Sequence, residues 1–449
     1  MCRGLTRRSF LQMTGLSLMN LALMPRLVVG QSVGTRAGAG KNLVFVNLYG
    51  GLDGLYAFPY LTGNISDLLY SSIRPTLSPA RNSLIEVQGQ TGRAQRMAFH
   101  GSFAPLTSRA ASRCAVIEGY GIPGDPGRSH DACQILMSLG QSERTGGGDM
   151  IGFMARLMDL LDWDSFQYWA LMTENPSDTN TRKRQPMAIS NVDQFDLPSM
   201  GWERDVDAAF AREIAETLAT LSTGQNQQEV LFAESVKRVR QSVAQVQGSV
   251  STQQVGNNSA GDYTDSSLGR SLKDAAKIIK AKTGNPEQQL SGKDMLILAG
   301  QGGFDTHSDQ ANTNSTDGNL PGLLSDMALN FAVFYVDLET SGALANTVVA
   351  SYSEFGRTVY PNGRTGDASA GTDHGHGSNT LVFGGPVRAG VYGVSPTVGE
   401  LSDRNYNALR ARVDFRDIFS EIFQWMGVDP KLVFSDSRYQ PQRLGFIST

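Results

Sequence analysis

The chain has 449 residues, of which 40% are hydrophobic and 18% are charged, so it can bury a sizeable core and is not a disordered protein. Its formal net charge is −4, and no basic patch or alternation of basic and aromatic residues indicates nucleic-acid binding. Three cysteines without a CxxC or zinc-ribbon spacing exclude a disulfide scaffold, although one bridge between Cys114 and Cys133 stays open.

The first 30 residues have the pattern of an export signal. The twin-arginine motif Thr6–Leu11 precedes an apolar stretch from Leu11 to Met24, and Val28–Gly30 offers compact residues for cleavage. The apolar stretch is too short and too often interrupted to span a bilayer, so we expect no stable membrane span after cleavage. The alternatives are an uncleaved anchor and a cytoplasmic start.

The signal predicts transport by the twin-arginine export machinery to the periplasm or the exterior. Residues 1–30 hold four of the 39 basic residues and no acidic residue, so the mature chain would have 35 basic and 43 acidic residues, a net charge of −8. Export in the folded state suits a protein that acquires a metal or cofactor beforehand.

A linker rich in glycine, serine, threonine and alanine over residues 31–41 precedes a domain over residues 42–449, in which short apolar runs alternate with helical patterns. Predicted strands are Asn42–Leu48, Cys114–Glu118, Met295–Ala299, Thr347–Ser351 and Thr380–Phe383. Predicted helices between them include Asp131–Leu139, Ile151–Leu161, Leu323–Leu338 and Phe415–Met426. This alternation predicts an α/β fold with a mostly parallel central sheet and helices on both faces.

Residues 202–290 differ from the rest of the chain. Helical spacing occurs at Ala208–Leu221, Glu229–Val246 and Leu268–Lys282, separated by links rich in Gly, Gln, Asn and Ser. We interpret this segment as a helical insertion within the domain, and a packed cap is favoured over a membrane-binding amphipathic role. A protein partner could also bind there.

Polar residues follow several of the predicted strands. Asp53 follows the first strand, Asp305 and His307 follow the strand at 295–299, and Glu354 follows the strand at 347–351. Because sites in open α/β sheets form at the carboxyl ends of the strands, these side chains are expected to share one crevice.

All five histidines lie in short polar loops that contain glycine or aspartate: His100, His130, His307, His374 and His376. The segments Asp305-Thr306-His307 and Asp373-His374-Gly375-His376 combine imidazole with carboxylate, which suits Zn²⁺, Mn²⁺ or Fe, whereas carboxylate-rich sites also take Mg²⁺ or Ca²⁺. The sequence therefore predicts a site for one or more divalent metal ions. The alternative is a hydrogen-bonded Asp–His network that orders glycine-rich loops.

The segment Gly127–Asp131 contains candidate catalytic residues. Ser129 would be exposed at the start of a helix, next to His130, and Arg128 could hold an oxyanion there. Alternatively, Ser129 only caps the helix. Arg357 is a second candidate for holding an anion, unless it forms a surface ion pair with Glu354.

Several motifs occur in an order that resembles a known family. They are Gly50–Leu55, Pro59-Tyr60, Arg74-Pro75, Gly127–His130, Gly303–His307, Ser353–Thr358 and Gly371–Gly377. With the twin-arginine start, they resemble the exported bacterial family labelled domain of unknown function 1501, over about 400 residues. That family in turn is similar to the alkaline phosphatase and sulfatase superfamily, whose enzymes hold one or two divalent metals at strand ends.

The resemblance implies a role for several residues. Asp53 matches the acidic metal ligand after the first strand, Ser129 lies in the region of the nucleophile, and Asp305 with His307 matches one metal-binding pair. His374 or His376 matches the late metal-binding histidine. Glu354 stands where an Asp-His pair is usual, and Asp373-His374 is the alternative second pair.

The resemblance thus implies an alkaline phosphatase-like sandwich and an exported metal-dependent hydrolase of small anionic phosphate-ester-like substrates. Sulfate esters are less expected, because the Cys-x-Pro-x-Arg motif of sulfatases is absent. The alternative is a non-catalytic periplasmic binding or assembly protein on a degenerate hydrolase fold. An iron oxygenase with two histidines and one carboxylate is a third hypothesis, but its usual all-β scaffold differs from the alternation of strands and helices in this chain.

Overall fold

The computed structural model describes residues 40–448, except for 125, 144–149, 173–175, 190, 193–241, 243–244, 284–289, 312–318, 364–366, 368 and 435. The predicted export signal, nearly all of the linker and the predicted helix at 208–221 lie outside the described residues, as does most of the helix at 229–246. Within the described part, none of the helices combines the length and the apolar character that a membrane crossing requires.

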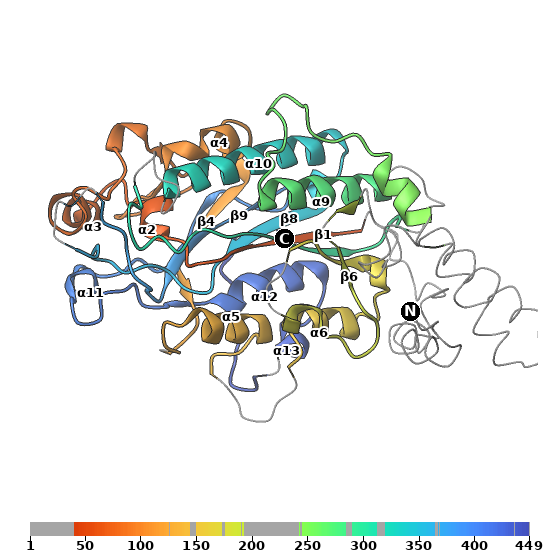
Figure 1. Cartoon of the computed structure of the whole chain (residues 1–449). Coiled ribbons are helices and arrows are strands. Elements are labelled where there is room, and N and C mark those ends of the chain that lie inside the picture. Colours follow the sequence, from red (N-terminus) through yellow and green to blue (C-terminus); the bar gives the residue numbers. More distant parts are fainter. Residues whose placement is uncertain are drawn as a thin grey trace, which may run out of the picture.

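A nine-stranded, largely parallel sheet forms the centre of the molecule (Figure 1), in the order β10-β4-β9-β8-β1-β7-β5-β6, with β11 paired to β4. Only β9 runs antiparallel to its neighbours, β4 and β8. The strands are β1 Asn42–Leu48, β4 Cys114–Gly121, β5 Tyr168–Ala170, β6 Met187–Ala188, β7 Met295–Gln301, β8 Thr347–Tyr352, β9 Ser378–Gly384, β10 Gly390–Gly393 and β11 Val413–Asp414. A separate pair joins β2 Ile85–Glu86 to β3 Ala98–Phe99.

Strand β1 shows why the apolar runs form this sheet. All seven of its residues are buried, as expected for a strand covered on both faces. Val44 and Val46 belong to the hydrophobic core on one side, whereas Leu43 and Phe45 belong to the core on the other side. Because successive side chains of a strand point to opposite faces, a continuous apolar run supplies both cores.

Helices cover both faces of the sheet (Figure 1), with α4, α9 and α10 on one face and α5, α6, α12 and α13 on the other. The helices are α2 Gly54–Ala57, α3 Asn64–Leu68, α4 Ala104–Ala110, α5 His130–Leu139, α6 Phe153–Leu160, α9 Ser267–Thr283, α10 Leu320–Thr340, α11 Val398–Ser402, α12 Phe415–Met426 and α13 Pro430–Val433. In α12, Phe415, Ile418, Phe419 and Ile422 follow helical spacing, and Phe419 packs edge-on against Phe45 of β1 at 4.9 Å.

Two predictions from the sequence can be compared with the structure here. The third helix of the expected insertion, at 268–282, is α9, and its buried face packs on α10 and β7 as part of the main core. Cys114 and Cys133 lie in the cores on opposite faces of the sheet and do not form a disulfide.

Candidate metal centre

Loops from three strands meet at one edge of the sheet. His130 is the first residue of α5, after β4, and Asp305 and His307 follow β7. His374 precedes β9, and because β9 is antiparallel, its beginning lies at the same edge as the carboxyl ends of β1, β7 and β8. The reversed direction of β9 therefore brings His374, which precedes its strand, to the same edge as His130 and Asp305, which follow theirs.

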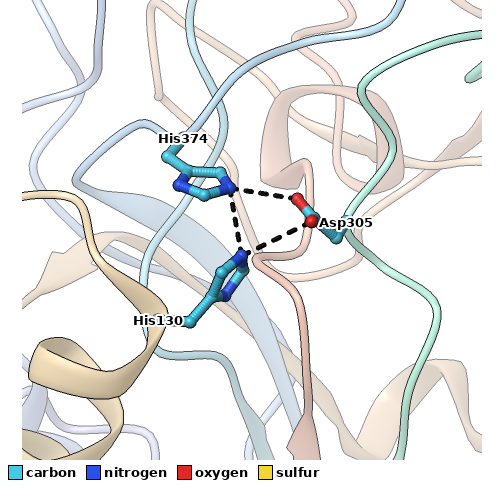
Figure 2. A group of neighbouring side chains, drawn as sticks. All are labelled: His130, Asp305 and His374. Atoms are coloured by element: carbon cyan, nitrogen blue, oxygen red, sulfur yellow. Dashed lines mark hydrogen bonds and ion pairs between the residues drawn. The ribbon is translucent and has the colours of Figure 1, made fainter.

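His130, Asp305 and His374 point toward one another (Figure 2) and form a group that could hold a metal ion, with ligand atoms within 4.8 Å of one another. The Nε2 atoms of His130 and His374 are 3.0 Å apart. Asp305 Oδ1 lies 3.1 Å from His374 Nε2, and Asp305 Oδ2 lies 3.5 Å from His130 Nε2.

His307 adds a third imidazole to this group. Its Nε2 lies 3.1 Å from His374 Nε2 and 3.0 Å from Asp305 Oδ1. The side chains of His307 and Asp305 are each 44% exposed, so the group opens to solvent. We call His130, His307, His374 and Asp305 the histidine cluster.

The other ring nitrogen of each histidine is held by an oxygen acceptor. His130 Nδ1 donates to Glu354 Oε1 at 2.7 Å, and His307 Nδ1 donates to Asp373 Oδ1 at 2.8 Å. His374 Nδ1 donates to the Arg128 carbonyl at 2.8 Å. Because carboxylate and carbonyl oxygens only accept, all three Nδ1 atoms carry a proton, and each neutral ring keeps an Nε2 lone pair.

These lone pairs give the cluster its chemistry. The Nε2 lone pairs of His130 and His307 both face that of His374, beside the Asp305 carboxylate, and they repel unless a cation or a proton lies between them. Nitrogen ligands of one tetrahedral zinc ion stand about 3.3 Å apart, close to the spacings seen here. A metal-bound histidine that donates its other N–H to a carboxylate or carbonyl is also the usual arrangement in metalloproteins. The donor set therefore fits a divalent metal ion.

The electrostatics of the cluster agree with this interpretation. The hydrogen bond to Glu354 raises the pKa of His130, against the opposing effect of burial. Burial alone would raise the pKa of Asp305, but the hydrogen bond from Arg357 and nearby histidines lower it. A proton on His130 and a metal ion would compete for the same lone pair, so metal binding is expected to weaken as the pH falls.

Arg357 is fully buried and positions Asp305. Its Nη1 donates to Asp305 Oδ1 at 2.6 Å and to the Gly50 carbonyl at 3.1 Å, and its Nη2 donates to the Thr372 carbonyl. The role expected from the sequence was to hold a substrate anion or to pair with Glu354. In the structure its carboxylate partner is Asp305, so its N–H groups are directed at the protein.

Glu354 contacts the cluster through His130. Its side chain is 1% exposed, and Oε1 accepts from His130 Nδ1, from the Gly50 backbone N–H at 2.9 Å and from Gln134 at 3.3 Å. Gly50 has a φ of +112°, and a Cβ there would approach the Asp305 backbone nitrogen to 2.4 Å, so glycine is required. The structure thus places Glu354 as the anchor of His130, whereas the sequence suggested direct metal binding.

Asp373 has the same relation to His307. Its Oδ1 accepts from His307 Nδ1 and from Asn362 Nδ2 at 3.1 Å. Burial would raise the pKa of Asp373, but the bonds from His307 and Asn362 lower it. Asp373 therefore stays ionised and fixes the orientation of His307.

Asp53 and His376 lie outside the histidine cluster. Asp53 is 1% exposed, accepts two hydrogen bonds from Arg74 Nη1 at 3.0 and 2.8 Å and one from Gln310 Nε2 at 2.6 Å, and caps α2. His376 uses Nδ1 to contact the Tyr406 hydroxyl at 2.6 Å and Nε2 to donate to the Ile122 carbonyl at 2.7 Å. Both residues are engaged by the protein, which is not the metal-binding role expected for them.

Ser129 and Arg128 flank His130. Ser129 occupies the N-cap position of α5, but its side chain makes no capping hydrogen bond and is exposed. Arg128 donates from Nη2 to the Tyr406 carbonyl at 2.6 Å and from Nη1 to the His374 carbonyl at 3.4 Å. Ser129 thus precedes a residue of the cluster in the chain, and the Arg128 guanidinium contacts the backbone of another.

The sequence did not indicate three supporting groups. The Arg128 carbonyl has no signal in a sequence, because any residue could supply it. Asn362 is likewise an ordinary loop residue. Gln134 stands four residues after His130 on α5, and this helical spacing could have indicated that both side chains share a face.

Comparisons with known proteins place these observations in context. The model of the family described as "Protein of unknown function (DUF1501)" matches residues 128–446, which include the whole histidine cluster. A search of curated proteins found no match.

Two solved structures resemble the chain weakly, each at 10% sequence identity. Ps i-CgsB in complex with k-i-k-neocarrahexaose has a TM-score of 0.34, with 87% of this chain and 73% of that chain covered. A phosphonate monoester hydrolase from Silicibacter pomeroyi has a TM-score of 0.30, with 89% and 78% covered.

Proposed function

The chain belongs to the DUF1501 family, and from its histidine cluster we propose that it is an exported metal-dependent hydrolase of phosphate-ester-like substrates. His130, His307, His374 and Asp305 would hold one divalent ion, with zinc favoured by the imidazole-rich ligand set and manganese, calcium and magnesium as the other candidates.

One observation carries this proposal. His374 Nε2 lies 3.0 Å from His130 Nε2 and 3.1 Å from His307 Nε2, beside the Asp305 carboxylate, while each Nδ1 is held by an acceptor. Structural metal sites are closed by their ligands, whereas catalytic sites keep an open position. The exposure of Asp305 and His307 supports access of a substrate to the ion.

The residues around the cluster have distinct parts in this proposal. When bound, a divalent ion would polarise the ester and stabilise charge on the departing oxygen. Glu354 and Asp373 keep His130 and His307 in the tautomer with a free Nε2, and Arg357 orients Asp305.

Ser129 remains the candidate nucleophile, since it is exposed, immediately precedes His130 in the chain and does not use its hydroxyl as a helix cap. Arg128 would hold the anionic oxygens of the ester, because its guanidinium lies against the backbone of His374. With Arg357 directed at Asp305, Arg128 is the nearer candidate for this role.

The proposal includes the alkaline phosphatase-like sandwich. A largely parallel sheet with helices on both faces and candidate ligands at the carboxyl edge is compatible with it. Among the described residues, the histidines and carboxylates form one group suited to a metal ion, so we propose a single ion. The twin-arginine motif supports a periplasmic or secreted location, and a partner on 202–290 stays part of the proposal.

The test is the metal content of the mature protein, purified after export without chelators. We expect about one equivalent of metal in the wild type and in His376→Gln, which changes a histidine outside the cluster, and loss of metal in His307→Ala. His307 is half exposed, so its removal should leave the fold intact. A wild type without bound metal would reject the proposal.

Activity is measured next against a panel of phosphate and sulfate esters. Ser129→Ala should abolish turnover and retain the metal, and full activity in that variant would exclude Ser129 as the nucleophile. A metal-loaded wild type that hydrolyses nothing in the panel would favour the non-catalytic binding protein instead.

A further inference from the structure

Two arginine–tyrosine stacks lie on loops next to the histidine cluster. The Arg404 guanidinium carbon is 4.0 Å from the centre of the Tyr360 ring, and that of Arg410 is 4.1 Å from the centre of the Tyr406 ring. We call these four side chains the arginine rim. Stacking on a ring fixes the plane of a guanidinium group and leaves the N–H groups at its edge accessible.

Tyr406 is connected to the cluster through Arg128. The Arg128 guanidinium donates to the Tyr406 carbonyl at 2.6 Å and lies 5.1 Å from the centre of the Tyr406 ring. The same guanidinium reaches the His374 carbonyl, and the Arg128 carbonyl holds His374 Nδ1. A single residue therefore separates this stack from a candidate metal ligand.

Tyr360 lies on the loop that reaches His307. Its backbone N–H donates to Asn407 Oδ1 at 2.7 Å, which joins it to the segment that carries both rim arginines. Two residues after Tyr360, Asn362 donates to the His307 carbonyl at 2.6 Å and to Asp373 Oδ1 at 3.1 Å. The first stack is thus linked to His374 through Arg128, and the second lies two residues from the Asn362 contact to His307.

The guanidinium groups of the rim keep their N–H donors. Arg404 is exposed and makes no ion pair with the residues that the structure describes. Arg410 is 50% exposed and lies 3.9 Å from Glu400 and 3.8 Å from Asp403, near the limit of an ion pair. Glu400 is instead engaged by Arg412 at 2.5 Å. Neither rim guanidinium donates a hydrogen bond to a described residue, so both can donate to a ligand.

We propose that the arginine rim binds a second anionic group of the substrate, so that the substrates are small esters with two or more sulfate or phosphate groups. This inference rests on the proposed function, in which the first anionic group lies at the metal ion. Guanidinium edges match the oxygens of sulfate and phosphate in bidentate hydrogen bonds, which the histidine cluster does not supply.

The experiment compares probes that differ in the number of charges, using the metal-loaded full chain and isothermal titration calorimetry. Sucrose octasulfate is compared with glucose 6-sulfate, and glucose 1,6-bisphosphate with glucose 6-phosphate. The variants are Arg404→Ala/Arg410→Ala and, as a matched control, Arg113→Ala, an exposed arginine that precedes β4 at the opposite edge of the sheet.

We expect the double variant to bind sucrose octasulfate about tenfold more weakly, with a shallower dependence on salt, and Arg113→Ala to bind like the wild type. Glucose 1,6-bisphosphate and glucose 6-phosphate show whether the arginine rim prefers phosphate or sulfate esters. Equal binding of the octasulfate by all three proteins would overturn the inference.

Asp305→Ala separates this inference from the proposed function. If that variant has no metal but still binds the octasulfate through Arg404 and Arg410, the rim is established without any hydrolase activity. If the wild type hydrolyses monoesters while the double variant binds every probe normally, the hydrolase stands and the rim is rejected.

Discussion

Asp53 and Asp305 follow neighbouring parallel strands, β1 and β7, yet their carboxylates have different surroundings. Asp53 is 1% exposed and accepts hydrogen bonds from Arg74, Gln310 and the start of α2. Asp305 is 44% exposed, accepts from Arg357, and faces imidazole lone pairs. Position at the edge of the sheet therefore does not by itself place a carboxylate among imidazole lone pairs: donors satisfy Asp53, whereas Asp305 faces acceptors as well as Arg357.

The largest effect is expected from Asp53→Asn. The substitution leaves the Arg74 guanidinium buried without its partner charge, so we expect a loss of about 3–5 kcal/mol in the free energy of unfolding. The metal content of the folded variant should not change. Urea unfolding measures the loss, and adding Arg74→Met should recover part of it. Loss of metal from folded Asp53→Asn would remove the distinction between the two aspartates.

Asp305→Ala, in contrast to Asp53→Asn, should weaken metal binding. We expect the affinity for the metal to fall by more than about 100-fold, beyond the usual effect of changing a residue behind the ligands. The free energy of unfolding of the metal-free protein should also fall, because the buried Arg357 guanidinium loses its carboxylate partner. We expect a smaller loss than in Asp53→Asn, because Asp305 itself is half exposed and Arg357 keeps its bonds to the Gly50 and Thr372 carbonyls. Competition with a chelating dye measures the affinity, and an unaltered value would contradict the assignment of Asp305.

Glu354→Gln tests the hydrogen bond that orients His130. The amide oxygen can still accept from His130 Nδ1 but lacks the negative charge, so we expect the metal affinity to fall by about tenfold. Gln134→Ala, which removes a longer contact of 3.3 Å to the same carboxylate, serves as the control and should have a smaller effect. A larger effect from Gln134→Ala than from Glu354→Gln would mean that the charge of Glu354 is unimportant.

His100 offers the most specific test, since it is a loop histidine outside the cluster. Its Nδ1 accepts from the Ser102 N–H, its ring stacks on Tyr56, and burial lowers its pKa to about 4. The unfolded chain therefore takes up a proton near pH 6.5 that the folded chain takes up only near pH 4. Stability should fall as the pH drops between these values, by up to about 1.4 kcal/mol per pH unit from this group.

His100→Asn keeps an acceptor for the Ser102 N–H and removes the titration. Its unfolding free energy should depend less steeply on pH between 6.5 and 4 than that of the wild type. An identical slope in both proteins would show that His100 does not titrate in this range. His130 differs from His100 because its neighbouring carboxylate raises its pKa.

Much of the fold could be predicted from periodicity. The apolar runs at 42–48, 295–299 and 347–351 coincide with β1, β7 and β8, and the pattern at 415–426 is α12. The short strand β5, Tyr168–Ala170, was missed because three residues show no period. The direction of β9 was also unpredictable, since an apolar run has no sign that distinguishes parallel from antiparallel pairing.

The candidate site was predicted less completely, for a physical reason. The sequence shows which residues carry carboxylate or imidazole, and it identified the loops of Asp305, His307 and His374. It does not show which donors satisfy them: Arg74 is 21 residues from Asp53, and Gln310 is 257 residues away. His130 was expected to act beside the nucleophile, and only its distance to His374 assigns it to the cluster.

The antiparallel strand β9 has a consequence for how the protein matures. His130 and His374 are 244 residues apart in the chain and meet when β4 pairs with β9, whereas Asp305 and His307 join them only after β8, β1 and β7 have paired as well. The unfolded chain therefore has no assembled metal site. An ion that binds only the folded protein would stabilise it by mass action. Bound metal would then report complete assembly of the sheet, and a fragment that ends before β9 would remain empty.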